Sequence, residues 1–350
     1  MAMKTDSNGR KNAPMADRGF KTAAVIGSGS FGTAVARLLQ PRLDRIHLIG
    51  REQAVADSIN HHHRNSQYLR DVELAPHVTA GTALADALGM ELVIFAVPTS
   101  GTRQAARDLA AAGLSPAVPM LSCAKGVEME TGERMSEILR DVFPESPIAV
   151  LSGPNHAEEI ARGMATCAVI GSADTELACR LQELFTLPHF RSYTSDDVAG
   201  LEFGGAIKNI YAIAAGMAHG LGLGDNAVAA LVTRALAEMT RLGTALGAQP
   251  ETFAGLSGVG DLIVTCFSEH SRNHRVGLAI GRGDTLEAAV AALGMVAEGV
   301  PNTRSIHQLA RRNQARTPII DAVHRVLYEG QPAAEAMREL LNRDPRPEQS

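Results

Sequence analysis

The stretch TAAVIGSGSFGTAVARLLQ, residues 22–40, decides the fold. It runs from a short apolar segment through the glycine pattern GSGSFG at 27–32 into a segment with helical spacing. In such a pattern Gly27 permits a tight turn, Gly29 lets a pyrophosphate approach the backbone, and Gly32 allows the helix to pack closely on the strand. Unpaired N–H groups at the helix start favour an anion there. We therefore predict a dinucleotide-binding site, the alternative being a glycine-rich turn without a ligand.

Segments of strand length alternate with longer helical stretches as far as about residue 195. Five strand-like segments are TAAVIG at 22–27, IHLIG at 46–50, LVIFAV at 92–97, PMLSCA at 119–124 and IAVLSG at 148–153. Their alternation with helical stretches is typical of a parallel sheet that is buried on both faces. We expect ATCAVIGS at 165–172 and FRSYTS at 190–195 to be two further strands that close this domain. Farther along the chain, apolar residues recur at helical spacing in 206–220, 226–246, 285–292, 303–310 and 319–328.

The predicted fold class is α/β: an N-terminal Rossmann-type dinucleotide-binding domain followed by an all-helical C-terminal domain. The length of 350 residues suits two domains. We expect the NAD(P)-binding domain at 21–195 and the helical substrate and catalytic domain at 196–341. Because 1–20 and 342–350 are polar and rich in helix breakers, we expect both to be disordered tails.

The composition favours small-molecule chemistry. Lys and Arg total 33 against 38 Asp and Glu, a net charge of -5, so no strong field exists to hold nucleic acid. Aromatic residues make up 4%, which supplies few rings for stacking bases. The longest apolar segment, 92–98, is too short to insert across a membrane, and 1–20 has no apolar signal segment. We expect a cytoplasmic protein with four reduced, buried thiols: Cys123, Cys167, Cys179 and Cys266.

The end of the second strand-like segment bears on the choice between NAD and NADP. It reads Ile49-Gly50-Arg51-Glu52. An acid at this place binds the ribose hydroxyls, whereas an arginine pairs with a 2′-phosphate. Both are present, and we expect Arg51 to face the adenosine ribose, so that NADP(H) is accepted and NAD(H) is not excluded.

Two further segments end at the predicted carboxyl edge of the sheet, where doubly wound folds bind ligands. LSCAKGVE places Lys125 there, as a ligand contact or as a surface lysine. SGPNHAEE places Asn155 and Glu158 at the spacing of a capping box, so Asn155 is a helix cap or a substrate contact. The N–H groups at and after Gly153 could donate to a substrate.

GLEFGGAIKNIYAIAAGMA, residues 200–218, places Lys208 in an apolar helix beside small residues. A lysine in this position reaches water, pairs with an acid or takes part in chemistry. Burial would lower its pKa from about 10.4 towards the working pH, as a proton donor to a forming alkoxide requires. Asn209 points to another helix face, and we expect it to serve packing.

Two later polar groups could complete a site. In GLSGVGDLIVTC, Asp261 follows a glycine-rich turn, where it caps a helix or orients Lys208. SEHSRNHR gathers Ser271, Arg272 and Asn273, a guanidinium beside a hydroxyl and an amide, which suits a phosphate. The alternative is a solvated loop.

These motifs together resemble one family over most of the chain, from about residue 22 to residue 328. The motifs are GSGSFGTA, INHHHRNSQYL, VIFAVPTS, SCAKGVE, SGPNHAEEIA, EFGGAIKNIYAIAAG, LSGVGDLIVTC, SRNHRVG and VAEGV. In this order and spacing they resemble the bacterial-type NAD(P)-dependent glycerol-3-phosphate dehydrogenases. Asn155 stands where that family often has Thr or Ser, and YLRDVELAP at 68–76 differs from the family's YLPG-type loop.

The resemblance implies a cytoplasmic enzyme that interconverts sn-glycerol 3-phosphate and dihydroxyacetone phosphate with NAD(P)H, usually for phospholipid synthesis. It implies that Lys208 moves the proton at the C2 oxygen. We expect no metal to be required, since the ammonium can polarise that oxygen in place of a Lewis acid. The implied substrate contacts are Lys125, Gly153, Asn155, Lys208, Asp261, Ser271, Arg272 and Asn273. The implied cofactor contacts, besides the glycines at 27, 29 and 32, are Ser30, Phe31, Arg51, Lys125, Ala157, Arg272, Val296 and Glu298. A homodimer through the helical domain is also expected.

Two alternatives stay open from the residues alone. Another lysine-dependent dehydrogenase of similar architecture would act on a hydroxy acid or a sugar acid. A sensor would bind NAD(P)H without turning it over, although a lysine set in an apolar helix argues against a sensor, which has no use for a desolvated proton donor.

Overall fold

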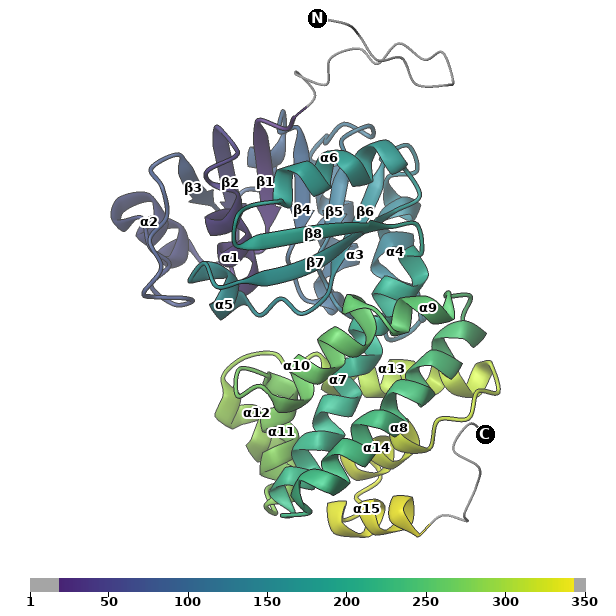
Figure 1. Ribbon diagram of the computed structural model, residues 1–350. Coiled ribbons are helices and arrows are strands. Elements are labelled where there is room, and N and C mark those ends of the chain that lie inside the picture. The colour runs from purple at the N-terminus through teal and green to yellow at the C-terminus, as the bar shows by residue number, and fades with distance from the viewer. Residues whose placement is uncertain (1–18, 343–350) are drawn as a thin grey trace, which may run out of the picture.

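The computed structural model describes residues 19–342. It has a sheet domain followed by a helical domain, which confirms the predicted fold class (Figure 1). The expected tails lie outside the described residues apart from Gly19, Phe20 and Asn342. The Phe20 ring is buried, and the guanidinium of Arg180 lies 4.1 Å from its centroid.

The N-terminal domain alternates strands and helices, as expected. Its elements are β1 (Thr22–Ile26), α1 (Ser30–Leu39), β2 (Arg45–Ile49), α2 (Gln53–His62), β3 (Val78–Gly81), η1 (Leu84–Ala87), β4 (Leu92–Phe95), α3 (Thr99–Ala111), β5 (Met120–Ser122), α4 (Met135–Val142), β6 (Ile148–Ser152), α5 (Ala157–Ala161), β7 (Thr166–Ser172), α6 (Thr175–Phe185) and β8 (Phe190–Ser195). All seven predicted strands are present, and β3 is an eighth that the sequence analysis missed because VTAG is short and only half apolar.

The eight strands form one sheet in the order β3-β2-β1-β4-β5-β6-β7-β8. The order reverses at β1, since Val25 pairs with Leu48 of β2 on one side and with Ile94 of β4 on the other. A doubly wound sheet binds its ligand outside the carboxyl ends of the strands at this switch point. The five segments expected to form a parallel sheet, β1, β2, β4, β5 and β6, do so. Of the two further strands, β7 runs antiparallel to β6.

Helices cover both faces of the sheet (Figure 1). Apolar side chains of α1, α2, α5 and α6 pack on one face, and those of α3 and α4 pack on the other. This arrangement explains why the strands read as continuous apolar runs rather than as alternating patterns.

The helical domain follows β8 directly. Its elements are α7 (Val198–Gly220), α8 (Gly224–Ala245), α9 (Pro250–Phe253), the π-helical turn η2 (Leu256–Gly260), α10 (Asp261–Phe267), α11 (Arg272–Gly281), α12 (Leu286–Leu293), α13 (Gly299–Arg312), α14 (Pro318–Tyr328) and α15 (Ala333–Leu341). The short elements α9, η2, α10, α11 and α15 were not expected. Among the described helices, none is long and apolar enough to cross a bilayer.

α7 runs through the middle of the helical domain and is buried from Gly200 to Ala218 (Figure 1). It lies against α11 with the two backbones in direct contact. A Cβ on Gly277 would come within 2.0 Å of the Ile213 carbonyl oxygen, and one on Gly216 within 2.1 Å of the His274 carbonyl oxygen. Glycine is needed at both places because no side chain fits.

All four cysteines are free thiols. Cys123 and Cys266 are buried as expected. The expectation of burial is wrong for Cys179, which is exposed on α6, and only partly right for Cys167 on β7. A cysteine on the outer face of an amphipathic helix reads the same in sequence as one on its inner face.

Candidate active site

The glycine pattern lies at the carboxyl end of β1, where the chain turns into α1. Gly27 has φ +113°, and a Cβ there would meet the Ala96 carbonyl oxygen at 2.6 Å. A Cβ on Gly32 would meet the Gly27 carbonyl oxygen at 1.9 Å, so helix and turn are packed together. Nothing lies within 4 Å of a Cβ on Gly29, so the space above the turn is open. The three glycines thus meet the three steric demands of a dinucleotide-binding turn.

The start of α1 offers backbone donors to an anion. Gly29 is its N-cap residue and has no side chain to satisfy them, and the first turn contains no acidic residue. The N–H groups of Ser30, Phe31 and Gly32 lie in the first turn of α1, where no earlier helical carbonyl accepts from them, and therefore suit a pyrophosphate. Arg51 is exposed at the carboxyl end of the neighbouring strand β2, beside the exposed Glu52.

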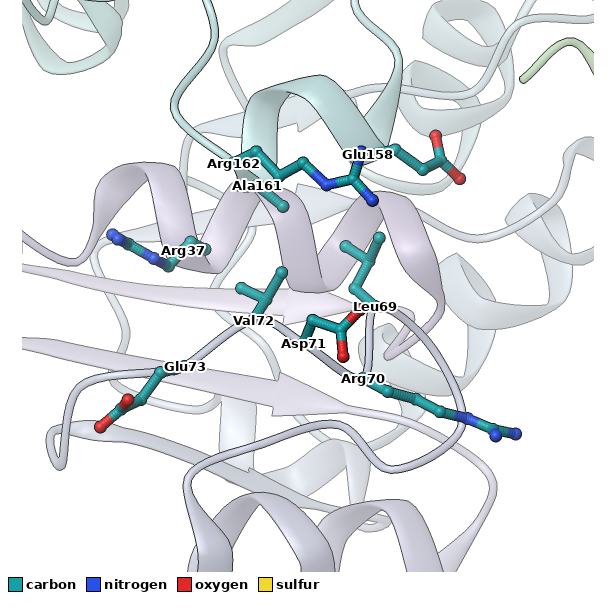
Figure 2. Close-up of a pocket in the computed structure, with 9 residues that line it drawn as sticks. All are labelled: Arg37, Leu69, Arg70, Asp71, Val72, Glu73, Glu158, Ala161 and Arg162. Atoms are coloured by element: carbon teal, nitrogen blue, oxygen red, sulfur yellow. The ribbon is translucent and has the colours of Figure 1, made fainter. Parts of the chain in front are cut away.

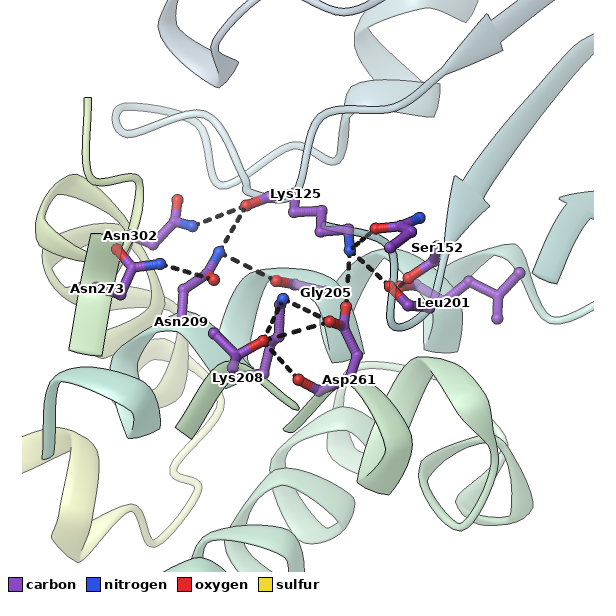
Figure 3. A network of polar contacts seen from close by, with 12 residues as sticks. Lys125, Ser152, Leu201, Gly205, Lys208, Asn209, Asp261, Asn273 and Asn302 are labelled. Atoms are coloured by element: carbon purple, nitrogen blue, oxygen red, sulfur yellow. Dashed lines mark hydrogen bonds and ion pairs between the residues drawn. The ribbon is translucent and has the colours of Figure 1, made fainter. Parts of the chain in front are cut away.

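Asp261 lies between two lysines that come from different domains (Figure 3). Its Oδ1 accepts a hydrogen bond from Lys208 Nζ at 2.6 Å, and its Oδ2 accepts one from Lys125 Nζ at 2.8 Å. Asp261 begins α10 directly after the π-helical turn, and Lys208 lies in α7. Of the two roles considered for Asp261, the structure shows the one in which it orients Lys208.

Burial controls the charge state of this cluster. It lowers the pKa of Lys208 to about 8, against the opposing effect of the Asp261 carboxylate. Burial alone would raise the pKa of Asp261, but the positive charges of Lys125 and Lys208 hold that pKa below its usual value. A lysine that titrates near neutral pH can give up and take back a proton at little cost.

Lys125 is held by three acceptors. Its Nζ donates to the Gly153 carbonyl oxygen at 2.8 Å and to Asn155 Oδ1 at 2.6 Å, besides Asp261. The capping-box expectation for Asn155 and Glu158 is wrong, because His156 is the N-cap residue of α5 and no side chain caps that helix. Asn155 Nδ2 is buried without a hydrogen-bond partner among the described residues. A buried amide donor left unpaired points to a ligand contact.

Lys208 has a second partner, Thr265, which the sequence analysis did not single out. Its Oγ1 accepts from Lys208 Nζ at 2.7 Å and donates to the Asp261 carbonyl oxygen at 2.5 Å. The bonds from Lys208 Nζ to Thr265 Oγ1 and to Asp261 Oδ1 occupy two of the three protons of the Lys208 ammonium. The sequence could have indicated that Thr265 lies near Lys208, because Thr265 follows Asp261 by four residues and so lies on the same face of the helix.

A chain of amides links Lys125 to α11 and α13. Asn209 Nδ2 donates to the Lys125 carbonyl oxygen at 3.3 Å, and Asn209 Oδ1 accepts from Asn273 Nδ2 at 2.9 Å. Asn273 Oδ1 in turn accepts from the Gly299 N–H at 2.9 Å. The expectation that Asn209 serves packing is therefore wrong. Asn302 Nδ2 also donates to the Lys125 carbonyl oxygen, at 2.9 Å.

The remaining predicted contacts lie around the start of α11. Ser271 is its N-cap residue and accepts from the His274 N–H. Arg272 is exposed and donates to the Val296 carbonyl oxygen at 2.8 Å. Glu298 accepts from the Thr99 N–H at 3.1 Å, at the start of α3. Of these residues, Glu298 contacts the sheet domain, at Thr99 just after β4. Ala157 begins α5, which packs on α1.

A surface pocket lies elsewhere, over α1 and α5 beside the loop that precedes β3 (Figure 2). Its lining residues are Arg37, Leu69, Arg70, Asp71, Val72, Glu73, Glu158, Ala161 and Arg162. None of them belongs to the predicted site. Within residues 19–342 no group of three or more His, Cys, Asp or Glu side chains could hold a metal ion.

The fold and this site define a class: dehydrogenases that use a nicotinamide dinucleotide and join a Rossmann-type domain to a helical domain. Family models agree in detail. Residues 22–178 match the NAD-dependent glycerol-3-phosphate dehydrogenase N-terminus, and residues 197–338 match the C-terminus of the same family. The chain belongs to the NAD-dependent glycerol-3-phosphate dehydrogenase family.

Individual relatives cover nearly the whole chain. A glycerol-3-phosphate dehydrogenase [NAD(P)+] from Exiguobacterium sp. is 46% identical over 91% of this chain and 95% of its own length. One from Myxococcus xanthus is 45% identical over 93% of this chain and 98% of its own. The crystal structure of glycerol-3-phosphate dehydrogenase from Coxiella burnetii has a TM-score of 0.89 at 34% identity, covering 93% of this chain and 99% of that chain.

Proposed function

We propose that the protein is a glycerol-3-phosphate dehydrogenase [NAD(P)+], which interconverts dihydroxyacetone phosphate and sn-glycerol 3-phosphate. One observation carries the proposal: the buried Lys208 ammonium, held by Asp261 and Thr265 at the carboxyl edge of a dinucleotide-binding sheet. The activity of the relatives, glycerol-3-phosphate dehydrogenases [NAD(P)+], supports the choice of substrate.

Lys208 is the proton donor in the reducing direction. Two of its three protons are held by Asp261 and Thr265, which leaves the third for the C2 oxygen of the substrate. Its positive charge also stabilises the negative charge that forms on that oxygen. In the oxidising direction the neutral amine takes the proton back. The nicotinamide cofactor, when bound, supplies or accepts the hydride.

The substrate phosphate is bound at the start of α11. Ser271, Arg272 and Asn273 offer a hydroxyl, a guanidinium and an amide. Asn273 donates to Asn209, which in turn donates to the Lys125 carbonyl oxygen. Anchoring the phosphate far from C2 orients the carbonyl towards Lys208. The proposed substrate contacts are completed by the unpaired Nδ2 donor of Asn155, together with Lys125, Gly153 and Asp261.

The proposed cofactor contacts include the open turn at Gly29 and residues of both domains. They are Gly27, Gly29, Ser30, Phe31, Gly32, Arg51, Lys125, Ala157, Arg272, Val296 and Glu298. The proposal places the NAD(P)-binding domain at 21–195 and the helical substrate domain at 196–341. This division is supported by the end of β8 at Ser195 and the start of α7 at Val198.

The proposal extends to the setting of the enzyme. It works in the cytoplasm, a location that the four free thiols support. Its product is the glycerol phosphate used in phospholipid synthesis. It forms a homodimer through the helical domain, where Ile263 and Phe267 expose apolar side chains one turn apart on α10.

A substrate panel with both cofactors tests the function. Dihydroxyacetone phosphate, unphosphorylated dihydroxyacetone and ketopantoate are each supplied with NADPH and with NADH, and oxidation is followed at the nicotinamide absorbance band. We expect turnover with dihydroxyacetone phosphate only. Preferred turnover of ketopantoate would favour a hydroxy-acid dehydrogenase, and binding of NADPH without any turnover would favour a sensor.

A further inference from the structure

Lys125 lies beyond the part of its strand that the sheet holds. β5 has only three residues, Met120–Ser122, and the last ladder-like bond after it runs from the Cys123 N–H to the Phe95 carbonyl oxygen. The next regular element, α4, begins at Met135. Contacts from outside the sheet must therefore fix the Lys125 backbone.

Two amides from the helical domain supply these contacts. Both donate to the Lys125 carbonyl oxygen, Asn302 Nδ2 at 2.9 Å and Asn209 Nδ2 at 3.3 Å (Figure 3). Asn302 makes the shorter bond, and its side chain is 1% exposed. A hydrogen bond made in a water-free environment is strong and is costly to lose.

Asn302 is itself held against the sheet. It lies one turn after Glu298 in α13, and its N–H bonds to the Glu298 carbonyl oxygen at 3.0 Å. A Cβ on Gly126 would come within 2.6 Å of Asn302 Oδ1 and within 2.5 Å of Thr99 Oγ1. The chain that leaves Lys125 thus passes directly between the start of α3 and the side chain of Asn302.

We propose that Asn302 is a positioning residue that fixes the backbone of Lys125, and through it the contact between Lys125 and Asp261. The inference rests on the proposed function, because activity is its readout. The Lys125 ammonium has three acceptors at 2.6 to 2.8 Å, so a backbone shift of about 1 Å breaks these bonds. Asp261 then loses one of its two cations.

Loss of that contact changes Lys208 in a defined direction. Lys208 faces Asp261 and Cys266 of α10, together with Lys125 and the His156 ring, which burial and the two lysines keep neutral. The charge of Lys125 holds the pKa of Lys208 down. When Lys125 is displaced, the pKa of Lys208 rises.

The test uses Asn302→Leu, which keeps the side-chain size and removes the donor. We expect kcat/KM for dihydroxyacetone phosphate to fall on the order of tenfold. We also expect the alkaline limb of the pH profile to move to higher pH. The matched control is Ser136→Ala, which removes a buried hydrogen bond to Glu202 at another place where the domains meet. We expect Ser136→Ala to leave the pH of the alkaline limb unchanged.

A second readout separates positioning from general stability. Adding Asn302→Leu to Lys125→Met should change kcat/KM less than about twofold, because residues that act as a unit are not additive. If the double variant is too slow to assay, the pH profile decides by itself. Should Asn302→Leu fail to fold, Asn302→Ala, which also lacks the donor and adds no charge, takes its place.

Two outcomes would overturn the proposal: an unmoved alkaline limb in the Asn302 variant, or additive losses in the double variant. Failure of the proposed function is distinguishable from both, since the wild-type protein would then not reduce dihydroxyacetone phosphate at all.

Discussion

Lys208 gives the proposed chemistry a pH dependence. Its pKa is about 8, and only the ammonium form can donate a proton in the reducing direction. We expect kcat/KM for reduction to be level below about pH 8 and to fall tenfold per unit above it. For oxidation, which needs the neutral amine, we expect kcat/KM to rise with pH up to about pH 8.

Initial rates over a pH series in both directions check this dependence. Lys208→Ala is the control variant, and we expect it to lower kcat by roughly 10²- to 10⁴-fold with cofactor affinity little changed. Its residual activity should lack the limb near pH 8. A Lys208→Ala enzyme with most of its turnover would exclude the lysine from the mechanism.

Arg51 should set the cofactor preference. It is exposed at the carboxyl end of β2, at the position where a guanidinium meets a 2′-phosphate. We expect Arg51→Ala to lower kcat/KM with NADPH by about 10-fold, the value of one charge-assisted hydrogen bond, and to leave NADH nearly unchanged. Steady-state kinetics with both cofactors measure the ratio. An unchanged ratio would refute the assignment.

Site residues could be predicted from the sequence where a short segment alone shows them, and could not where they depend on contacts between distant segments. A lysine inside an apolar helix is visible in one line of sequence, and so Lys208 was found. The amide of Asn302 reaches Lys125 across 177 positions, and that contact is visible only in three dimensions. Asn209 was misjudged because its helix face depends on which elements surround α7.

Elements were predictable where burial produces a regular pattern. Six strands, β1, β2, β4, β5, β6 and β7, are buried at nearly every position, and their apolar runs were recognised to within a residue or two. α10 and α11 were missed for a physical reason: the first follows a glycine-rich π-helical turn and the second begins with the polar segment SRNHR. Both irregularities belong to the site, where local preferences yield to function.

The contact between α7 and α11 makes a sharp prediction for stability. Gly277→Ala would place its Cβ 2.0 Å from the Ile213 carbonyl oxygen, and backbone cannot move aside cheaply. We expect a loss of about 3 kcal/mol in the free energy of unfolding. Chemical denaturation followed by circular dichroism measures it.

Gly101 in α3 is the matched control. It is also a helical glycine, but the nearest atom to its added Cβ lies 4.0 Å away. We expect Gly101→Ala to be neutral or to stabilise the protein by about 0.5 to 1 kcal/mol. Equal effects of the two substitutions would mean that helix propensity, and not the α7–α11 contact, governs both.

At the scale of the whole molecule, the two domains have separate apolar cores, which are joined by polar contacts and by a small apolar cluster of Val150, Val169 and Leu201. One core lies on the sheet and another surrounds α7. Between the cores, Lys125 contacts Asp261. Ser152 Oγ donates to the Leu201 carbonyl oxygen at 3.0 Å. Arg134 and Ser136 bind the buried carboxylate of Glu202. Because these bonds are buried, separating the domains leaves charged groups unpaired, and so we expect the domains to unfold together.

Cofactor-linked unfolding tests this coupling. We expect NADPH to bind mainly to the sheet domain. At a concentration of 100 times its Kd, it adds about 2.7 kcal/mol to the free energy of unfolding of the cooperative unit that contains the binding site. If the domains unfold together, calorimetry shows one transition, which moves as a whole by a few degrees. If they unfold separately, there are two transitions and only the one that belongs to the sheet moves. In that case the contacts of Lys125 and Glu202 would position the domains without coupling their stability.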